Sequence, residues 1–179
     1  MKSAKWYPRL LLVLTGYLFF YLTGCAPVIS KEIRDRVSEE LTLSEVAKNP
    51  EAYKGTTVLW SGLIISAINL QEGTMIEVLQ KPADVRGKPK DVDYSEGRFL
   101  VIDPRYLDVA IYTQGRMVTV AGEVQGKKIQ DLGEMKYTYP LVSAKEIYLW
   151  PEEREERYYY PYPYWDYPWW HYPYPHPGW

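Results

Sequence analysis

Residues 57–79 read TVLWSGLIISAINLQEGTMIEVL, and this stretch decides the fold class. Its first part, residues 57–70, is rich in Val, Ile and Leu and carries Gly62 near the centre. Glycine inside a long strand often marks a bulge or a tight bend. Residues 73–79 alternate, and the polar stretch between the two runs is short enough for a hairpin. The stretch therefore predicts a β-hairpin whose first strand is bent.

More strands are expected as far as residue 150. Apolar and β-branched runs bounded by glycine and proline predict strands at 98–102, 116–124, 128–139 and 141–150. The breakers between them predict a polar loop at 81–97, a helical turn at 106–112 and a short turn at 125–127. The body thus contains about six short strands.

One or two helices are expected before these strands. Apolar residues at four-residue spacing predict a first helix over 31–41. Thr42 begins a capping box, with Glu45 three residues later, for a second helix that Pro50 ends. Trp60, in the long strand, is expected in the core rather than as a ligand platform.

The order of these elements predicts a mainly β fold, a small OB-fold-like antiparallel β-barrel. The order begins with Asn-Pro-Glu-Ala-Tyr-Lys-Gly at 49–55. The bent strand, the hairpin and the loop follow, and then comes Gly-Arg-Met-Val-Thr-Val-Ala-Gly-Glu-Val at 115–124. A five-stranded barrel of this kind manages its strand edges by closure. A plain β-sandwich is the competing architecture. A body of about 125 residues is large enough to bury one core without help.

The N-terminus has the pattern of a secretory signal. Three basic residues precede an apolar run over 10–22, and Leu22-Thr23-Gly24-Cys25 follows. The apolar run is shorter than the roughly 18 residues of a membrane-spanning helix. The alternative is that the segment stays uncleaved as a membrane anchor and that the cysteine after it stands there by chance. Cys25 is the chain's single cysteine, which excludes a disulfide scaffold and a Cys-rich zinc site.

Leu22-Thr23-Gly24-Cys25 resembles the lipobox of bacterial lipoproteins. The resemblance implies a diacylglyceryl group on the Cys25 sulfur, cleavage between Gly24 and Cys25, and acylation of the new amino group. Stable attachment to a membrane requires two membrane signals, and this anchor would supply three acyl chains. Lipoproteins that are retained at the inner membrane tend to have Asp at the position of Ala26. The absence of Asp there favours the outer membrane, and we expect the protein on its periplasmic face. Cleavage would leave 18 basic residues against 23 acidic ones.

The body also carries a family resemblance in an ordered set of short pieces. They are Val58-Leu59-Trp60-Ser61-Gly62, Ile64, Asn69, Thr74, Glu77-Val78-Leu79, Pro82, Gly87, Pro89, Gly97-Arg98-Phe99-Leu100, Leu107-Asp108, Gly115-Arg116, Val118-Thr119-Val120, Gly122, Gly133-Glu134, Tyr137, Tyr139-Pro140 and Leu149-Trp150. Behind a lipobox, this set resembles the Slp family of outer-membrane lipoproteins. Ser61 and Val109 depart from it, since the family tends to have glycine and proline there. The resemblance implies an envelope lipoprotein linked to starvation or stress, with no established catalytic residues.

The body offers little for catalysis. Its carboxylates are interpreted as turn formers, caps or solvent-facing groups, namely Asp103, Asp108, Glu123 and Glu134. The body has no histidine for a nucleophilic triad and no phosphate-binding glycine loop. We expect no enzyme activity, no cofactor and no dedicated metal site. The formal net charge of −2 argues against a nucleic-acid binder.

Arg98 and Arg116 are the candidate binding residues of the body. Each follows a glycine at the start of a predicted strand, so the pair could form an anion-binding edge of the barrel. The alternative is a structural ion pair with Glu77, Glu134 or Asp108.

The C-terminal tail holds the aromatic excess. After a charged linker over 151–157, residues 158–179 contain eight Tyr and four Trp among prolines. Repeated prolines and few aliphatic residues predict a disordered or polyproline II tail. Candidate binding residues are Tyr162, Trp165, Trp169 and Trp170, which could stack on peptidoglycan or lipopolysaccharide, lie at the bilayer interface, or dock on a partner. A tail without a partner is the alternative, and His171 and His176 are at most a weak metal site.

These assignments divide the chain into a signal peptide (1–24), a lipidated tether (25–30), a barrel domain (31–150) and a linker with tail (151–179). The expected function is that of an outer-membrane-anchored lipoprotein with a structural or stress-related role and no catalysis. The alternative is a glycan- or anion-binding envelope module that uses the barrel edge or the tail.

Overall fold

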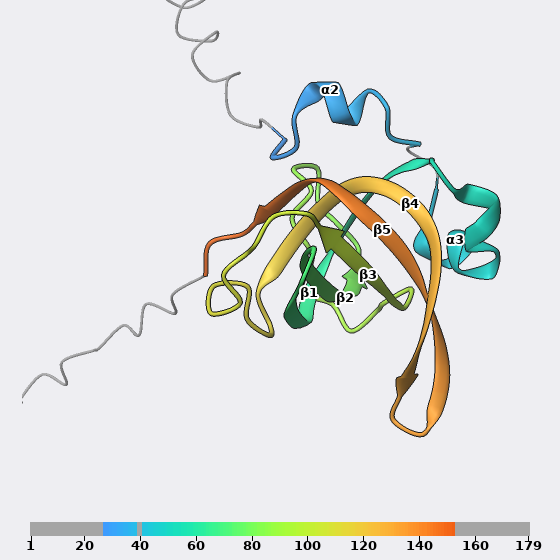
Figure 1. The fold of residues 1–179 in the computed structure, drawn as a ribbon. Helices are drawn as coiled ribbons and strands as arrows, with labels where there is room; N and C mark the ends of the chain where they lie inside the picture. The colour runs from blue at the N-terminus through green and yellow to red at the C-terminus, as the bar shows by residue number, and fades with distance from the viewer. Residues whose placement is uncertain (1–26, 39–40, 153–179) are drawn as a thin grey trace, which may run out of the picture.

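The computed structural model describes residues 27–38 and 41–152, and its centre is a closed five-stranded barrel (Figure 1). The strands follow the order β1-β2-β3-β5-β4 around the barrel, and β1 pairs with β4 to close it. Their bounds are β1 (Thr57–Leu70), β2 (Gly73–Lys81), β3 (Arg98–Asp103), β4 (Met117–Leu132) and β5 (Met135–Leu149). The mainly β, OB-fold-like barrel is confirmed, and closure rules out the sandwich.

One strand pair departs from the predicted antiparallel arrangement. β3 and β5 run parallel over 100–102 and 141–143, whereas the other four pairs are antiparallel. The reason is geometric: in a ring with an odd number of strands, directions cannot alternate all the way round. A five-stranded closed barrel must therefore contain a parallel pair.

Two glycines allow the strands to come close where the barrel bends. A Cβ at Gly62 would clash with the carbonyl oxygen of Leu79 on β2, and one at Gly122 would clash with that of Ser143 on β5. Near Gly122 the pairing of β4 with β5 also shifts register between Ala121 and Gly122. The predicted bend at Gly62 thus coincides with a backbone approach that no other residue permits.

The last two strands are longer than predicted, and the turn expected at 125–127 is wrong. β4 continues through Gly126 with a register shift, and its pairing with β5 extends to Leu132 and Met135. The hairpin turn lies at Gly133 and Glu134 instead, so five strands replace the predicted six. Pro140 sits inside β5 opposite Lys127, beside the bulge, where a missing N–H is tolerated. The hairpin projects well beyond the barrel (Figure 1).

The helices are short. Thr42 Oγ1 accepts a hydrogen bond from the Glu45 amide and caps α3 (Leu43–Lys48), as predicted, and a 3₁₀ turn, η1 (Pro50–Tyr53), follows. The first helix, α2 (Lys31–Arg34), is much shorter than the expected 31–41. It has no side-chain cap and buries none of its residues, so no packed face extends it. Over 106–112 the chain makes only a single turn, in which the amides of Ile111 and Tyr112 donate to the carbonyl of Asp108.

The core lies inside the barrel and beneath α3. Trp60 and Phe99 meet edge to face with 5.2 Å between ring centroids, and the Trp60 indole N–H donates to the carbonyl of Leu41. The predicted place of Trp60 in the core is confirmed. Leu43 and Val46 of α3 are fully buried against the same cluster and close one end of the barrel.

Replacing Gly62 with alanine should destabilise the barrel strongly. The new Cβ overlaps the Leu79 carbonyl oxygen, a backbone atom that cannot move without breaking the β1–β2 pairing. We expect Gly62→Ala to lower the free energy of unfolding by about 3 kcal/mol in urea titrations. Ser66→Ala, at an exposed position of the same strand, should change it by less than about 0.5 kcal/mol. Equal effects of the two variants would contradict the close approach.

Candidate functional site

The outer face of β2 and β3 carries an ion pair covered by tyrosines. Arg98 Nη1 lies 2.8 Å from Glu77 Oε1, and the Tyr139 hydroxyl donates to the same oxygen at 3.1 Å. The hydrogen bond to Glu77 raises the pKa of Arg98, and burial together with the Glu77 charge raises that of Tyr139. Of the partners predicted for Arg98, the one it contacts is Glu77.

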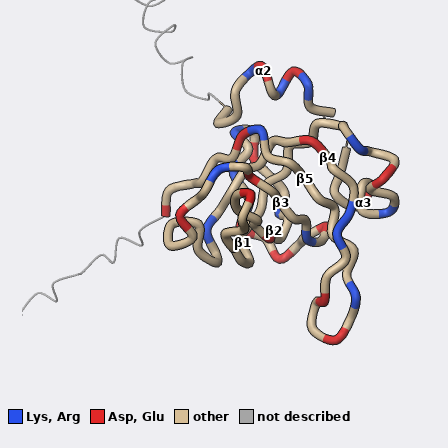
Figure 2. The backbone as a smooth tube through the Cα atoms, viewed as in Figure 1, with Lys and Arg blue, Asp and Glu red and all other residues tan. Residues whose placement is uncertain are grey.

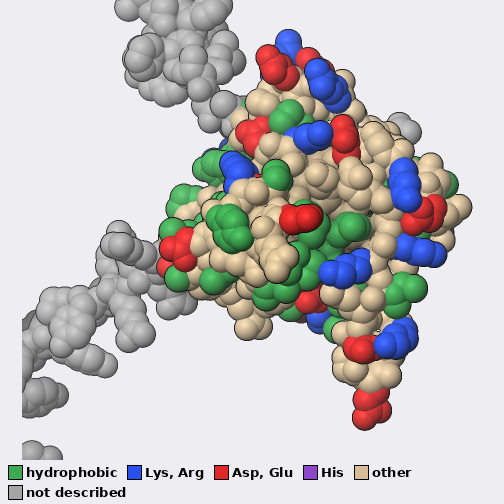
Figure 3. All heavy atoms as spheres, in the orientation of Figure 1, with side chains coloured by type: hydrophobic (Ala, Val, Ile, Leu, Met, Phe, Trp, Pro, Cys, Tyr) green, Lys and Arg blue, Asp and Glu red, His purple; other side chains and the backbone are tan. Residues whose placement is uncertain are grey.

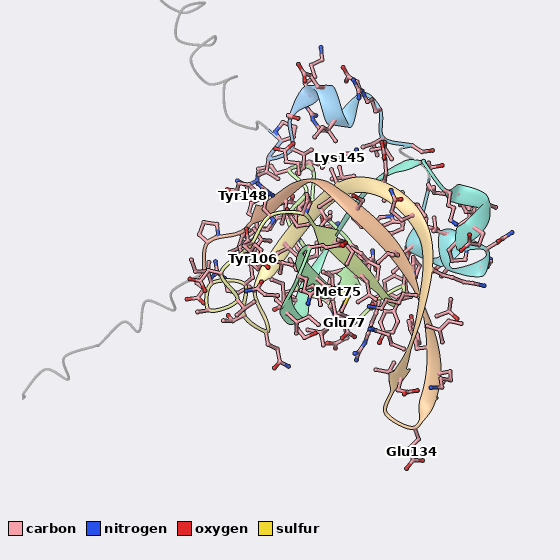
Figure 4. All side chains as sticks on the ribbon, viewed as in Figure 1. Met75, Glu77, Tyr106, Glu134, Lys145 and Tyr148 are labelled. Carbon is pink, nitrogen blue, oxygen red and sulfur yellow. The ribbon has the colours of Figure 1, made fainter. Side chains whose placement is uncertain are left out.

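A small apolar cluster surrounds this ion pair. Met75, Leu100 and Tyr139 are buried together, with Tyr137 packed edge to face on Tyr139 at 4.6 Å. Figure 3 shows hydrophobic side chains gathered over β2 and β3, and Figure 4 shows Met75 and Glu77 side by side there. Both tyrosines come from β5, so the chain covers this face with its own hairpin.

Arg116 holds the last strand rather than facing solvent. Its Nη1 donates to the carbonyl of Ile111 and its Nη2 to that of Trp150, while Nε lies 3.8 Å from a Glu152 carboxylate oxygen. None of the three partners predicted for Arg116 is among these contacts. Arg98 and Arg116 thus engage separate groups and do not come together in one anion site.

A buried hydroxyl cluster holds the loop between β2 and β3, here called the 82–90 loop. The hydroxyls of Ser61 and Thr119 lie 2.7 and 2.6 Å from the Gly87 carbonyl oxygen, to which they donate. The indole N–H of Trp150 donates to Thr119 Oγ1 at 2.9 Å. Ser61 and Thr119 are buried. The cluster joins two barrel strands, a loop and the end of β5 at one point.

The N-terminal residues lie against the same loop. Ile29 is 3% exposed, and the Val28 amide donates to the carbonyl of Arg86 at 3.4 Å. The Ser30 amide donates to Glu146 Oε2 at 3.0 Å. Figure 1 shows this segment, in blue, beside the light-green loop. Residues 27–30, expected as an extended tether, therefore pack on the barrel.

Sequence reasoning missed this cluster. Its members are far apart in the sequence, and serine, threonine and glycine in strands and loops carry no periodic signal. The one available sign was Asp84 followed by Gly87, which is typical of a tight turn. Asp84 Oδ1 indeed accepts hydrogen bonds from the amides of Arg86 and Lys88.

Asp103 is locked into a structural pair with Arg105. The carboxylate is 1% exposed and accepts hydrogen bonds from the Arg105 amide, Nε and Nη2. Although burial raises the pKa of Asp103, the hydrogen bonds from Arg105 outweigh it and the pKa lies below its ordinary value. The carboxylate stays ionised and forms the turn after β3, which confirms its interpretation as a turn former.

The other carboxylates of the body also have simple surroundings. Glu123 pairs with Lys145 at 3.3 Å on the surface, and Asp108 Oδ1 accepts a hydrogen bond from the Ala110 amide. Glu134 lies at the tip of the hairpin (Figure 4). Within residues 27–38 and 41–152, no three His, Cys, Asp or Glu side chains are grouped to hold a metal ion.

Several predicted sites lie outside the described residues. They are Gly24 and Cys25 at the lipobox, and Tyr162, Trp165, Trp169, Trp170, His171 and His176 in the tail. In the described part of the chain, no helix has the length and apolar character to cross a membrane. Basic and acidic residues are interspersed over the described backbone (Figure 2).

Replacing Asp103 with asparagine tests the pair with Arg105. Folding lowers the pKa of Asp103, so the ionised carboxylate stabilises the folded state. This contribution to the free energy of unfolding is complete above about pH 4, the ordinary pKa, and is lost as the pH falls through the pKa of the folded state. Asp103→Asn should cost about 2 kcal/mol of unfolding free energy at neutral pH. The difference from wild type should close in acid, as followed by urea titration at several pH values.

The matched control for this experiment is Asp131→Asn. Asp131 forms an exposed pair with Lys136, and such pairs contribute little. A difference between wild type and Asp103→Asn that stays constant down to the lowest pH would contradict the role given to the carboxylate.

Comparison with known proteins identifies the family to which this chain is similar. Residues 22–176 match the outer membrane lipoprotein Slp family. An uncharacterized protein of Haemophilus influenzae is 31% identical over 135 residues, which cover 74% of this chain and 72% of the relative.

Two solved structures of single-stranded DNA-binding proteins are also similar, at a low level. One is the mitochondrial protein of S. cerevisiae, with a TM-score of 0.32 and 13% identity. The other is a small protein of Streptomyces coelicolor, with a TM-score of 0.32 and 17% identity. Each comparison covers 53% of this chain and 94% of the other chain. The match over residues 22–176 is the decisive one, and by it the chain belongs to the outer membrane lipoprotein Slp family.

Proposed function

We propose that acyl chains on Cys25 anchor this protein in the outer membrane and hold its barrel at the periplasmic face in a non-catalytic role. Membership of the Slp family supports the outer membrane as the location and lipoprotein as the class of protein. Within this proposal residues 1–24 are the signal, 25–30 the lipidated segment, 31–150 the barrel domain and 151–179 the linker and tail. The structural or stress-related role implied by the family resemblance belongs to the same proposal.

The packing of the chain directly after Cys25 carries the proposal. Ile29, four residues beyond Cys25, is buried, and the amides on either side of it are held by Arg86 and Glu146. Arg34 Nε also donates to the Ile29 carbonyl. A lipid on Cys25 would therefore position the whole barrel, because only Ala26 and Pro27 stand between Cys25 and the packed residues 28–30.

The state of the carboxylates supports a non-catalytic role. General acids in enzymes usually have a raised pKa, whereas Asp103, Asp84 and Glu51 all have a lowered pKa and stay ionised. At Asp103 burial raises the pKa, but the hydrogen bonds from Arg105 outweigh it. The Lys88 amide lowers the pKa of Asp84, and the Lys54 side chain lowers that of Glu51. These are the surroundings of structural groups.

The covered face of the barrel supports the expectation of no nucleic-acid partner. OB-folds bind oligonucleotides and oligosaccharides on the face of strands 2 and 3. In this chain Tyr137 and Tyr139 cover that face, and Glu77 already neutralises its Arg98.

Metabolic labelling with palmitate tests the anchor. The wild-type protein should incorporate the label and shorten by residues 1–24, whereas Cys25→Ser should do neither, because serine has no thiol to be modified. Ser38→Cys, which supplies a cysteine outside the lipobox, should not restore labelling to the Cys25→Ser protein. Equal labelling of wild type and Cys25→Ser would refute the anchor.

A second candidate function, glycan binding, rests on the tail. Its eight Tyr and four Trp offer ring faces for sugars, and the docked Trp150 fixes the point from which the tail leaves the barrel. Tyr162, Trp165, Trp169 and Trp170 are the residues proposed to stack. The barrel edge is a weaker candidate, because Arg98 and Arg116 already have acceptors within the protein.

Removing the rings without shortening the tail tests this candidate. Replacing Tyr162, Trp165, Trp169 and Trp170 with serine should reduce retention on purified peptidoglycan or lipopolysaccharide by about tenfold or more, since each stacked ring contributes on the order of 1 kcal/mol. Deletion of 158–179 should reduce it at least as far. Unchanged retention in a sedimentation assay would remove the tail from any glycan-binding role.

A further inference from the structure

We propose that the 82–90 loop is a lipid-contact surface that seats the barrel directly on the phospholipid leaflet holding the Cys25 acyl chains. This inference rests on the proposed lipid anchor and adds to it a specific face and residues. Val85, at the tip of the loop, is 88% exposed, the highest value among the large exposed hydrophobic residues described.

The loop presents Val85 on a rigid turn. The carbonyl of Asp84 accepts a hydrogen bond from the Gly87 amide, and the Asp84 amide donates to the Lys88 carbonyl. The Asp84 side chain holds the amides of Arg86 and Lys88 at 2.8 Å each. Gly87 adopts a φ of +91°, which glycine accepts without strain. The apolar side chain of Val85 is thus held out in water by hydrogen bonds among the four residues around it, Asp84, Arg86, Gly87 and Lys88.

The base of the loop is fixed to the barrel. Two buried hydroxyls, those of Ser61 and Thr119, donate to the Gly87 carbonyl, and the Lys88 ammonium lies over the Trp150 ring at 6.0 Å. The loop therefore has a fixed direction relative to the barrel, and what it touches determines how the barrel is oriented.

The length of chain to the anchor places this loop at the membrane. Two peptide steps separate Cys25 from Pro27, and a residue spans at most about 3.6 Å, so the reach is about 7 Å. The headgroup region of one leaflet is about 5–7 Å thick. Val28 lies against Gly87 and its amide meets the Arg86 carbonyl. Val28 is one step further, so with acyl chains in the hydrocarbon core the loop lies within about 11 Å of Cys25 along the chain, close to the headgroups.

The chemistry of the loop suits a phospholipid surface. Residues 82–90 contain three basic residues and one acidic one, with Arg86 directly beside the exposed Val85. Basic residues attract anionic headgroups, and a small apolar tip can enter the interface. A single exposed valine is ordinary elsewhere on a protein surface. Here its rigid support and the short stretch of chain between Cys25 and the packed N-terminal segment set it apart.

The β4–β5 hairpin provides a matched control surface. Met135, at its turn, is 61% exposed and apolar like Val85. In Figure 4 Glu134 marks this tip at one end of the molecule, and Lys145 lies at the other end near α2. The proposed orientation places the hairpin tip away from the leaflet that the loop touches.

The experiment compares single thiols in the acylated full-length protein. Val85→Cys and Met135→Cys are labelled with an environment-sensitive fluorophore and reconstituted into phosphatidylethanolamine–phosphatidylglycerol vesicles with doxyl-labelled lipid as quencher. The label at 85 should shift to the blue and be quenched by the lipid, and the label at 135 should stay in water. If both labels stay in water although the protein floats with the vesicles, the lipid contact of the loop is refuted and the proposed anchor on Cys25 is not.

The remaining outcomes are equally informative. Fluorophore on Cys25 and failure to float with the vesicles would refute the proposed anchor, because the Cys25 thiol would then be free. A label at 85 that leaves water but escapes the lipid quencher would show a second copy or another protein on the loop, and would also overturn the lipid contact.

Adding Arg86→Gln to Val85→Cys tests the charge contribution. The substitution leaves the backbone groups that Asp84 and Val28 use, and removes a basic side chain that lies 3.9 Å from the Asp84 carboxylate at the surface. The ratio of lipid-contacting to water-exposed label should fall about fivefold, as expected for one basic residue near an anionic membrane. Lys136→Gln, on the hairpin, should leave the ratio unchanged. Equal ratios in the Arg86→Gln and Lys136→Gln proteins would contradict the electrostatic part of the contact.

Discussion

The arrangement of this molecule depends on the hydroxyl of Thr119. This buried oxygen donates to the Gly87 carbonyl and accepts from the Trp150 indole, while Ser61 donates to the same carbonyl. Without it, the buried Trp150 indole would lose its partner, which costs about 1–3 kcal/mol, and the Gly87 carbonyl would keep only the bond from Ser61. Through these bonds the 82–90 loop and the end of β5 are both attached to the wall formed by β1 and β4. The N-terminal segment in turn packs on that loop.

Residues near both ends of the described chain therefore contact the 82–90 loop. The Val28 amide donates to the Arg86 carbonyl, and the Lys88 ammonium lies over the Trp150 ring. The face that OB-folds use for ligands lies instead over β2 and β3, beneath Tyr137 and Tyr139. In the proposed function the packing of Val28 and Ile29 on the barrel lets a short lipid anchor orient the whole domain.

Local signals in the sequence predict the barrel but not its attachments. The strand at 57–70 is confirmed because Gly62, the apolar run and the hairpin at 71–72 all act within a few residues. The turn expected near Gly126 is wrong because pairing with the partner strand overrides a local breaker. The hydrogen bond of Thr119 to Gly87 joins residues 32 positions apart and has no periodic pattern. Among the candidate sites, the pairing of Arg98 with Glu77 was one predicted option, whereas the packed N-terminal segment was not expected.

The central claim is that the barrel rests on the membrane with no gap between them. Neutron reflectometry of the acylated full-length protein on a supported phospholipid bilayer measures that gap directly. The protein layer should begin at the headgroups, with the hairpin on its outer side. A water layer between the headgroups and the barrel, wider than the roughly 7 Å that the chain from Cys25 to Pro27 can span, would contradict it.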